Sequence, residues 1–346
     1  MFGITFLELV LFAQQFGLAL AGAASLWGFI FVLKGLRNQH GGTCVTFDWL
    51  ARRLLYLLYA GAGIAILSWL VLLMTLPAHA HEGIVIVPEL AERAAALKFT
   101  SPVYVAWLLL FLPLGLLSRV TPAQFHRRLS LFYAAHFALI LFLISVPAWA
   151  GDISSRQLFF IGHGFHSIFT LGTVLVLDFL FLISKSSLHL KRHIYPLFPT
   201  ISKVILVGLG IDFLSVALIF SEAIALTPKF FFMQTVVGIL LINGAILAGP
   251  LTRRLMNAAE SSEGRLAKRW EFLGDVAGTI SITSWFTITF VDFFAELSLN
   301  YRGLLLVYCS VLFAAIIIHL VWTRTHKDPI SEQLLAWHRS GEYASH

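Results

Sequence analysis

Long apolar runs alternate with short polar segments along the whole chain. Each run is long enough to cross a hydrocarbon core of about 30 Å as a helix. We therefore predict an all-α, polytopic membrane protein with nine transmembrane helices: residues 4–33, 50–75, 100–118, 129–149, 160–184, 200–221, 229–250, 271–295 and 303–323.

Positive charge gathers in alternate loops. The segments after the first, third, fifth and seventh runs, and the C-terminal tail, carry most of the basic residues, among them Arg52, Arg53, Arg127, Arg128, Lys191, Arg192, Arg253, Arg254, Arg324 and Lys327. Cytoplasmic loops are enriched in Lys and Arg, so this pattern predicts an external N-terminus and a cytoplasmic C-terminus. The first apolar run is too long for a signal peptide, and we expect a retained helix there.

A short sequence recurs within the chain. GAGIAILSWL at 61–70 is echoed by GLGIDFLSVA at 208–217, an offset of 147 residues. An internal echo indicates a duplicated unit, and both copies begin outside. We predict two parallel four-helix repeats, residues 1–150 and 151–297, followed by a ninth helix and cytoplasmic tail at 298–346. The alternative is chance recurrence, since small residues are common at helix contacts in membranes.

Composition narrows the functional classes. The chain is 58% hydrophobic and 12% charged, against about 25% charged in soluble domains. Its net charge of +6 lies in loops, where membrane orientation explains it better than nucleic acid does. Cys44 and Cys309 give no disulfide framework or metal motif. No HExxH, GxSxG or phosphate-binding loop is present, so we assign no catalytic residues and leave enzymatic activity open, favouring none.

Histidines supply the first candidate site. His163 and His166, in GHGFHS, are spaced i, i+3 and share a helical face. Neutral imidazole binds copper, zinc or haem iron, and His79 and His81 on the same predicted outer side could complete a metal site. The alternative is an interfacial pair that solvates a helix end, with His79 and His81 as ordinary loop residues.

Ionisable groups inside a bilayer are costly and often functional. Asp212 and Ser215 share a face of the sixth predicted span, and Asp178 and Asp292 lie in the fifth and eighth; these four residues could line a proton or ion path. Asp212 could equally lock helix packing. The eighth span also carries a slowly turning stripe of Asp275 and hydroxyl residues, which either packs or lines a path.

Two further histidines, His136 and His319, lie well inside predicted spans. Two such side chains at similar depth could clamp a b-type haem. The alternative is a hydrogen bond from each histidine to a neighbouring helix.

The fifth span, HGFHSIFTLGTVLVLDFLFL, resembles helices of the bacterial copper-resistance D-type (CopD-like) membrane proteins, mainly over residues 160–184. In those proteins a His near the outer end is followed by a small-residue step, which His166 and Gly172 match here. The resemblance implies metal or haem handling in a bacterial inner membrane, with His166 as a ligand.

Three functional hypotheses follow. The first is an inner-membrane protein that binds a metal ion such as copper, or a b-type haem, near its outer face, for metal handling or electron transfer. The second is a proton-coupled secondary transporter that uses Asp178, Asp212 and Asp292. The third is a non-catalytic subunit or assembly factor with a membrane or periplasmic protein partner. All three place the chain in a lipid bilayer, and none involves nucleic acid.

Overall fold

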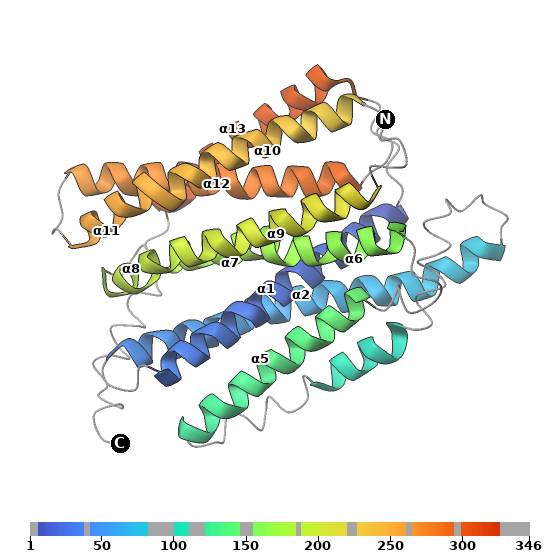
Figure 1. Cartoon of the computed structure of the whole chain (residues 1–346), viewed down its shortest axis with the longest axis horizontal. Coiled ribbons are helices and arrows are strands. Elements are labelled where there is room, and N and C mark those ends of the chain that lie inside the picture. The colour runs from blue at the N-terminus through green and yellow to red at the C-terminus, as the bar shows by residue number, and fades with distance from the viewer. Residues whose placement is uncertain are drawn as a thin grey trace. The chain divides into compact units, whose positions relative to one another are not determined.

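Every element that the structure describes is helical (Figure 1). The structure is a computed structural model, and it describes residues 6–37, 42–81, 100–110, 122–145, 155–184, 188–219, 227–260, 265–293 and 299–325. The helices are α1 (Phe6–Arg37), α2 (Gly42–His81), the unlabelled Thr100–Leu110, α5 (Pro122–Ser145), α6 (Ser155–Ser167), η2 (Ile168–Gly172), α7 (Thr173–Ser184), α8 (Leu188–Ile194), η3 (Tyr195–Leu197), α9 (Phe198–Ile219), α10 (Pro228–Ile246), η5 (Leu247–Leu251), α11 (Thr252–Glu260), α12 (Arg265–Phe293) and α13 (Tyr301–Thr325).

Seven helical segments in the described part of the chain are long and apolar enough to cross a membrane. They are Phe6–Arg37, Thr46–Thr75, Arg128–Ser145, Ile161–Ser184, Leu190–Ile211, Pro228–Asn257 and Tyr301–Val321. The described residues are thus all-helical, as predicted, and these seven apolar segments support a multi-pass membrane protein.

The predicted count of nine spans is not confirmed. Within the predicted third span, the described helix is the shorter Thr100–Leu110. The predicted eighth span falls in α12, which is not among the seven because charged and hydroxyl side chains lower its hydropathy.

The surface of α13 suits a bilayer. Only 11% of its apolar window is buried against the rest of the chain. Leu306, Phe313 and Ile318 are 70%, 67% and 66% exposed. An apolar surface of this extent is at home against lipid tails rather than water.

The contacts divide the chain into two compact units. Unit 1 comprises Met1–Val176, Lys203–Leu226 and Thr289–Ser298, and unit 2 comprises Leu177–Ser202, Thr227–Ile288 and Leu299–His346. Residues of α7, α9 and α12 therefore belong partly to each unit. Such a division does not test a gene duplication, so the predicted boundaries at 150 and 297 stay a prediction.

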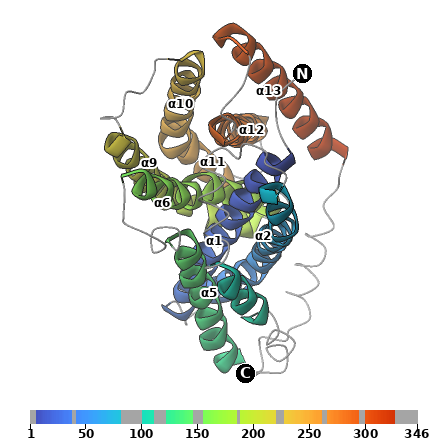
Figure 2. The same cartoon turned by 90° about the vertical axis from the view of Figure 1, so that its right-hand side faces the viewer.

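In unit 1, α1 and α2 lie side by side and touch through their backbones (Figure 2). A Cβ atom added at Gly17 would lie 2.6 Å from the backbone nitrogen of Ala65, and one added at Gly61 would lie 2.6 Å from that of Ala21. Each helix thus contributes a Gly-xxx-Ala pair. Small residues at this spacing let membrane helices approach closely, and the gain is van der Waals packing.

The opposite side of α1 packs on the π turn η2. A Cβ atom at Gly172 would clash with the carbonyl oxygen of Ala19 in α1. The indole of Trp27 donates to the hydroxyl of Thr173 over 3.3 Å. A single π turn inside a membrane helix shifts the faces on either side of it and is frequent at functional sites.

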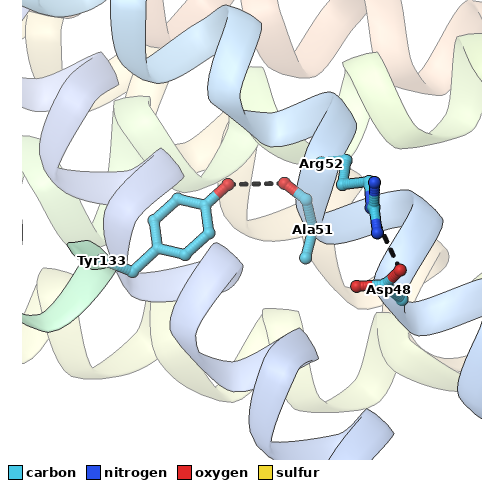
Figure 3. Close-up of polar contacts among 4 residues, drawn as sticks. All are labelled: Asp48, Ala51, Arg52 and Tyr133. Carbon is cyan, nitrogen blue, oxygen red and sulfur yellow. Dashed lines mark hydrogen bonds and ion pairs between the residues drawn. The ribbon is translucent and has the colours of Figure 1, made fainter. Parts of the chain in front are cut away.

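Tyr133 of α5 joins three helices of unit 1. Its ring occupies the space that a side chain at Gly28 of α1 would need. Its hydroxyl donates to the backbone carbonyl of Ala51 in α2 (Figure 3). On the same stretch of α2, buried Asp48 pairs with Arg52 one turn later at 3.1 Å.

Unit 2 is held by polar contacts between helices. The side-chain amide of Asn243 in α10 donates to the carbonyl of Ala277 in α12 over 2.9 Å. The hydroxyls of Ser284 in α12 and Tyr308 in α13 lie 2.8 Å apart. Pro250, which cannot donate a backbone hydrogen bond, lies inside the π turn η5, so the helix continues past it into α11.

Candidate functional site

His163 and His166 lie in the last turns of α6, immediately before the π turn η2. Both belong to the membrane-length segment Ile161–Ser184, His163 in its first turn and His166 about one turn deeper. His166 is buried, and His163 is half-buried. The i, i+3 spacing places their rings together, with centroids 5.7 Å apart.

The ring of His166 is oriented by a backbone carbonyl. Its Nδ1 lies 3.1 Å from the carbonyl oxygen of Gly208 in α9. A carbonyl only accepts, so Nδ1 donates, and Nε2 carries the lone pair of the neutral ring. Oγ1 of Thr170 lies 3.5 Å from Nε2 of the ring, and its hydroxyl donates to the backbone oxygen of His166 over 2.7 Å.

Gly208 makes this contact possible. A Cβ atom there would lie 2.7 Å from the Thr170 methyl and 2.8 Å from Cβ of Phe169. α9 therefore approaches η2 closely only because residue 208 has no side chain. Gly210, two positions later, has no such neighbour within 4 Å.

The separation of the two rings suits a shared metal ion. A metal bound at about 2.0–2.1 Å from a histidine nitrogen lies about 3.2 Å from the ring centroid. Two rings on one ion then have centroids about 5–6.4 Å apart, depending on the angle between them. The observed 5.7 Å lies in that interval. Among the described residues, however, no three His, Cys, Asp or Glu side chains form a group that could hold a metal.

Several predicted site residues lie outside what can be described. The backbone of His79 and His81 is in α2, that of Asp212 and Ser215 in α9, and that of Asp292 in α12. The side chains of these five residues lie outside the described part of the structure. Their predicted roles stay predictions.

The proposed haem pair falls in separate units, His136 in unit 1 and His319 in unit 2. Nδ1 of His136 donates to the carbonyl of Phe132 in its own helix over 2.9 Å. Nε2 of His319 lies 3.6 Å from Oδ1 of Asp275. Each histidine therefore has a protein neighbour of its own, and the haem clamp stays a prediction.

The second concentration of ionisable groups lies in unit 2. Asp275 of α12 faces His319 of α13, and Asp178 of α7 faces Gly278, whose added Cβ atom would lie 3.1 Å from Oδ1 of Asp178. Oδ2 of Asp178 is buried and has no hydrogen-bond partner among the described residues. From the sequence, Asp178 was predicted to line an ion path, His319 to bind haem, and Asp275 to belong to the stripe of hydroxyl residues in the eighth span. The pairing of Asp275 with His319 joins positions 44 residues apart (319 − 275), for which no local pattern exists.

Comparison of the chain with protein-family models, with curated proteins and with solved structures finds no match.

Proposed function

We propose that this membrane protein binds a transition-metal ion, of the copper or zinc class, through His163 and His166 near one surface of the bilayer. The observation that carries the proposal is the hydrogen bond from Nδ1 of His166 to the carbonyl of Gly208. Metal-binding histidines characteristically donate their second ring nitrogen to a carbonyl or carboxylate, which fixes the tautomer and leaves the other nitrogen as the ligand.

A metal ion fits this pair better than a haem held by both histidines. Axial haem ligands approach the iron from opposite faces of the ring, whereas His163 and His166 project from one face of one helix. Two imidazoles leave the coordination sphere incomplete. His79 and His81, which the sequence predicts on the same side, are the proposed further ligands.

The proposed setting follows the sequence: two parallel repeats, nine spans, an external N-terminus and a bacterial inner membrane. Equivalent glycines support the duplication. Gly61 and Gly208 both face a neighbouring helix too closely for a side chain, whereas Gly63 and Gly210 both have nothing within 4 Å. In this setting the two histidines lie at the outer surface, where a periplasmic metal ion reaches them.

Metal analysis of the purified protein tests the proposal. After loading with Cu²⁺ or Zn²⁺ and removal of excess, the wild-type chain should retain a stoichiometric amount. His166→Asn should lose it while folding normally, because the Asn amide can still donate to Gly208 but offers no nitrogen at the Nε2 position. His163→Ala should also lose it, and His193→Ala on α8 is the matched control. A wild-type protein that retains no metal, or a His166→Asn variant that retains it fully, would contradict the proposal.

A further inference from the structure

Unit 2 contains an aspartate, Asp178, within a membrane-length helical segment. Asp178 belongs to the membrane-length segment Ile161–Ser184. Its Oδ2 is buried and has no hydrogen-bond partner in the described part of the chain. Its Oδ1 faces α12 at Gly278. A carboxylate in such a place needs a proton or a cation, because neither lipid nor apolar side chains solvate its charge.

A second acid and a histidine lie nearby. Asp275 precedes Gly278 by three residues, so it lies on the same side of α12, about 4.5 Å along the helix axis. Its Oδ1 is 3.6 Å from Nε2 of His319 on α13. The side chain of Asp275 is 11% exposed and that of His319 is 30% exposed, so the histidine is the member of the pair nearer the surface of unit 2.

Two basic side chains of unit 2, Lys191 and Arg254, have partners other than Asp178. Lys191 of α8 and Glu271 of α12 form an ion pair at 2.5 Å. The guanidinium of Arg254 in α11 lies over the Trp270 ring, 5.0 Å from its centroid. Tyr195 on η3 is the phenol that interacts electrostatically with Asp275, whereas the hydroxyl of Tyr308 on α13 contacts Ser284.

We propose that Asp178, Asp275 and His319 form a site in unit 2 that binds and releases a proton. A proton on Asp178 removes the charge of that carboxyl, which lies beside the pair formed by Asp275 and His319. Loss of one proton leaves a net negative charge, which is what makes the site responsive to proton supply. This proposal is independent of the metal site in unit 1 and gives the chain a means of coupling to a proton gradient.

Infrared spectroscopy of the purified protein in lipid nanodiscs tests the proposal. The carbonyl stretch of a protonated carboxylic acid is distinct from the bands of a carboxylate. Wild-type protein should show this band at neutral pH and lose it on alkaline titration. Asp178→Asn should remove it. Glu271→Gln should leave it, because Glu271 is ion-paired with Lys191.

A second variant guards against misfolding of Asp178→Asn. Gly278→Ala places a methyl group against Oδ1 of Asp178 and should shift the carbonyl frequency without abolishing the band. Gly244→Ala on α10, where nothing lies within 4 Å, should leave the frequency unchanged. The proposal is overturned if wild-type protein has no protonated carboxyl band, if the intensity of the band in Asp178→Asn equals that of the wild type, or if added Na⁺ removes it at constant pH, which would make the ligand a metal cation.

Discussion

The close approach of α1 and α2 gives the sharpest test of the structure. Gly61 and Gly63 are two positions apart in one helix, yet a methyl group at Gly61 would meet backbone atoms of α1 at 2.6 and 2.8 Å, whereas one at Gly63 would meet nothing within 4 Å. We therefore compare Gly61→Ala with Gly63→Ala.

The expected difference in stability can be estimated. Replacing Gly by Ala in a helix interior gains up to about 1 kcal/mol of helix propensity, and both variants share that gain. Only Gly61→Ala also pushes two backbones apart, and forcing extra atoms into a packed contact costs about 1–3 kcal/mol. Gly61→Ala should therefore be less stable than Gly63→Ala by about 1–3 kcal/mol, and Gly63→Ala should be at least as stable as the wild type.

The assay is unfolding by SDS of protein purified in a mild detergent, followed by tryptophan fluorescence. Trp27 and Trp69 are buried in unit 1 and report on its packing. Equal midpoints for Gly61→Ala and Gly63→Ala would refute the backbone contact. Gly208→Ala and Gly210→Ala form a second pair with the same expected order but a smaller gap, because the nearest neighbour of Gly208 is the Thr170 methyl group, which can rotate, rather than a backbone atom.

Three further substitutions test other contacts. Thr227→Ala removes the side chain that accepts a hydrogen bond from the first turn of α10, so the stability of that helix end should fall by about 1 kcal/mol. Faster amide hydrogen exchange in the first turn would show this loss, and Thr227→Ser, which keeps the hydroxyl, should leave the exchange rate unchanged. Asn243→Leu removes a bond between α10 and α12 and should lower the SDS midpoint by an amount equivalent to about 0.6–1.7 kcal/mol; no change would mean that the bond contributes nothing. Tyr133→Phe keeps the ring beside α1 but loses the hydrogen bond to α2, so its thermal midpoint should fall by an amount equivalent to about 1 kcal/mol. The fall should be smaller than the one caused by Tyr133→Ala, which loses the ring as well.

The helices themselves were predictable because the length of an apolar run alone limits what a membrane segment can be. The residues at which the helices end were harder to predict. The second predicted span, 50–75, lies within α2, which continues to His81, since a helix does not stop where hydrophobicity does. The seventh predicted span ended at Pro250, where the chain instead forms a π turn and continues to Glu260. A proline removes one backbone donor, and the sequence does not say whether the local geometry can absorb that loss.

For the candidate sites too, contacts within one helix could be predicted from the sequence and contacts between helices could not. His163 and His166 are neighbours because helical spacing makes them so, and the prediction of a shared face is confirmed by their ring separation of 5.7 Å. The contact of His166 with Gly208 and that of His319 with Asp275 join different helices. Such contacts depend on how helices rotate and cross, which packing decides and local spacing does not.

The joint between α1 and α2 also bears on how the protein is made. It depends on close van der Waals packing between small residues, namely Gly17, Ala21, Gly61 and Ala65, rather than on hydrophobicity. Lipid tails are as apolar as side chains but cannot reproduce this close backbone contact. These four residues lie within the first 65 of the chain. Because residues 17–65 precede the remaining helices, such a hairpin is able to close before those helices are synthesised, and α5 and η2 both pack on α1 in the folded chain.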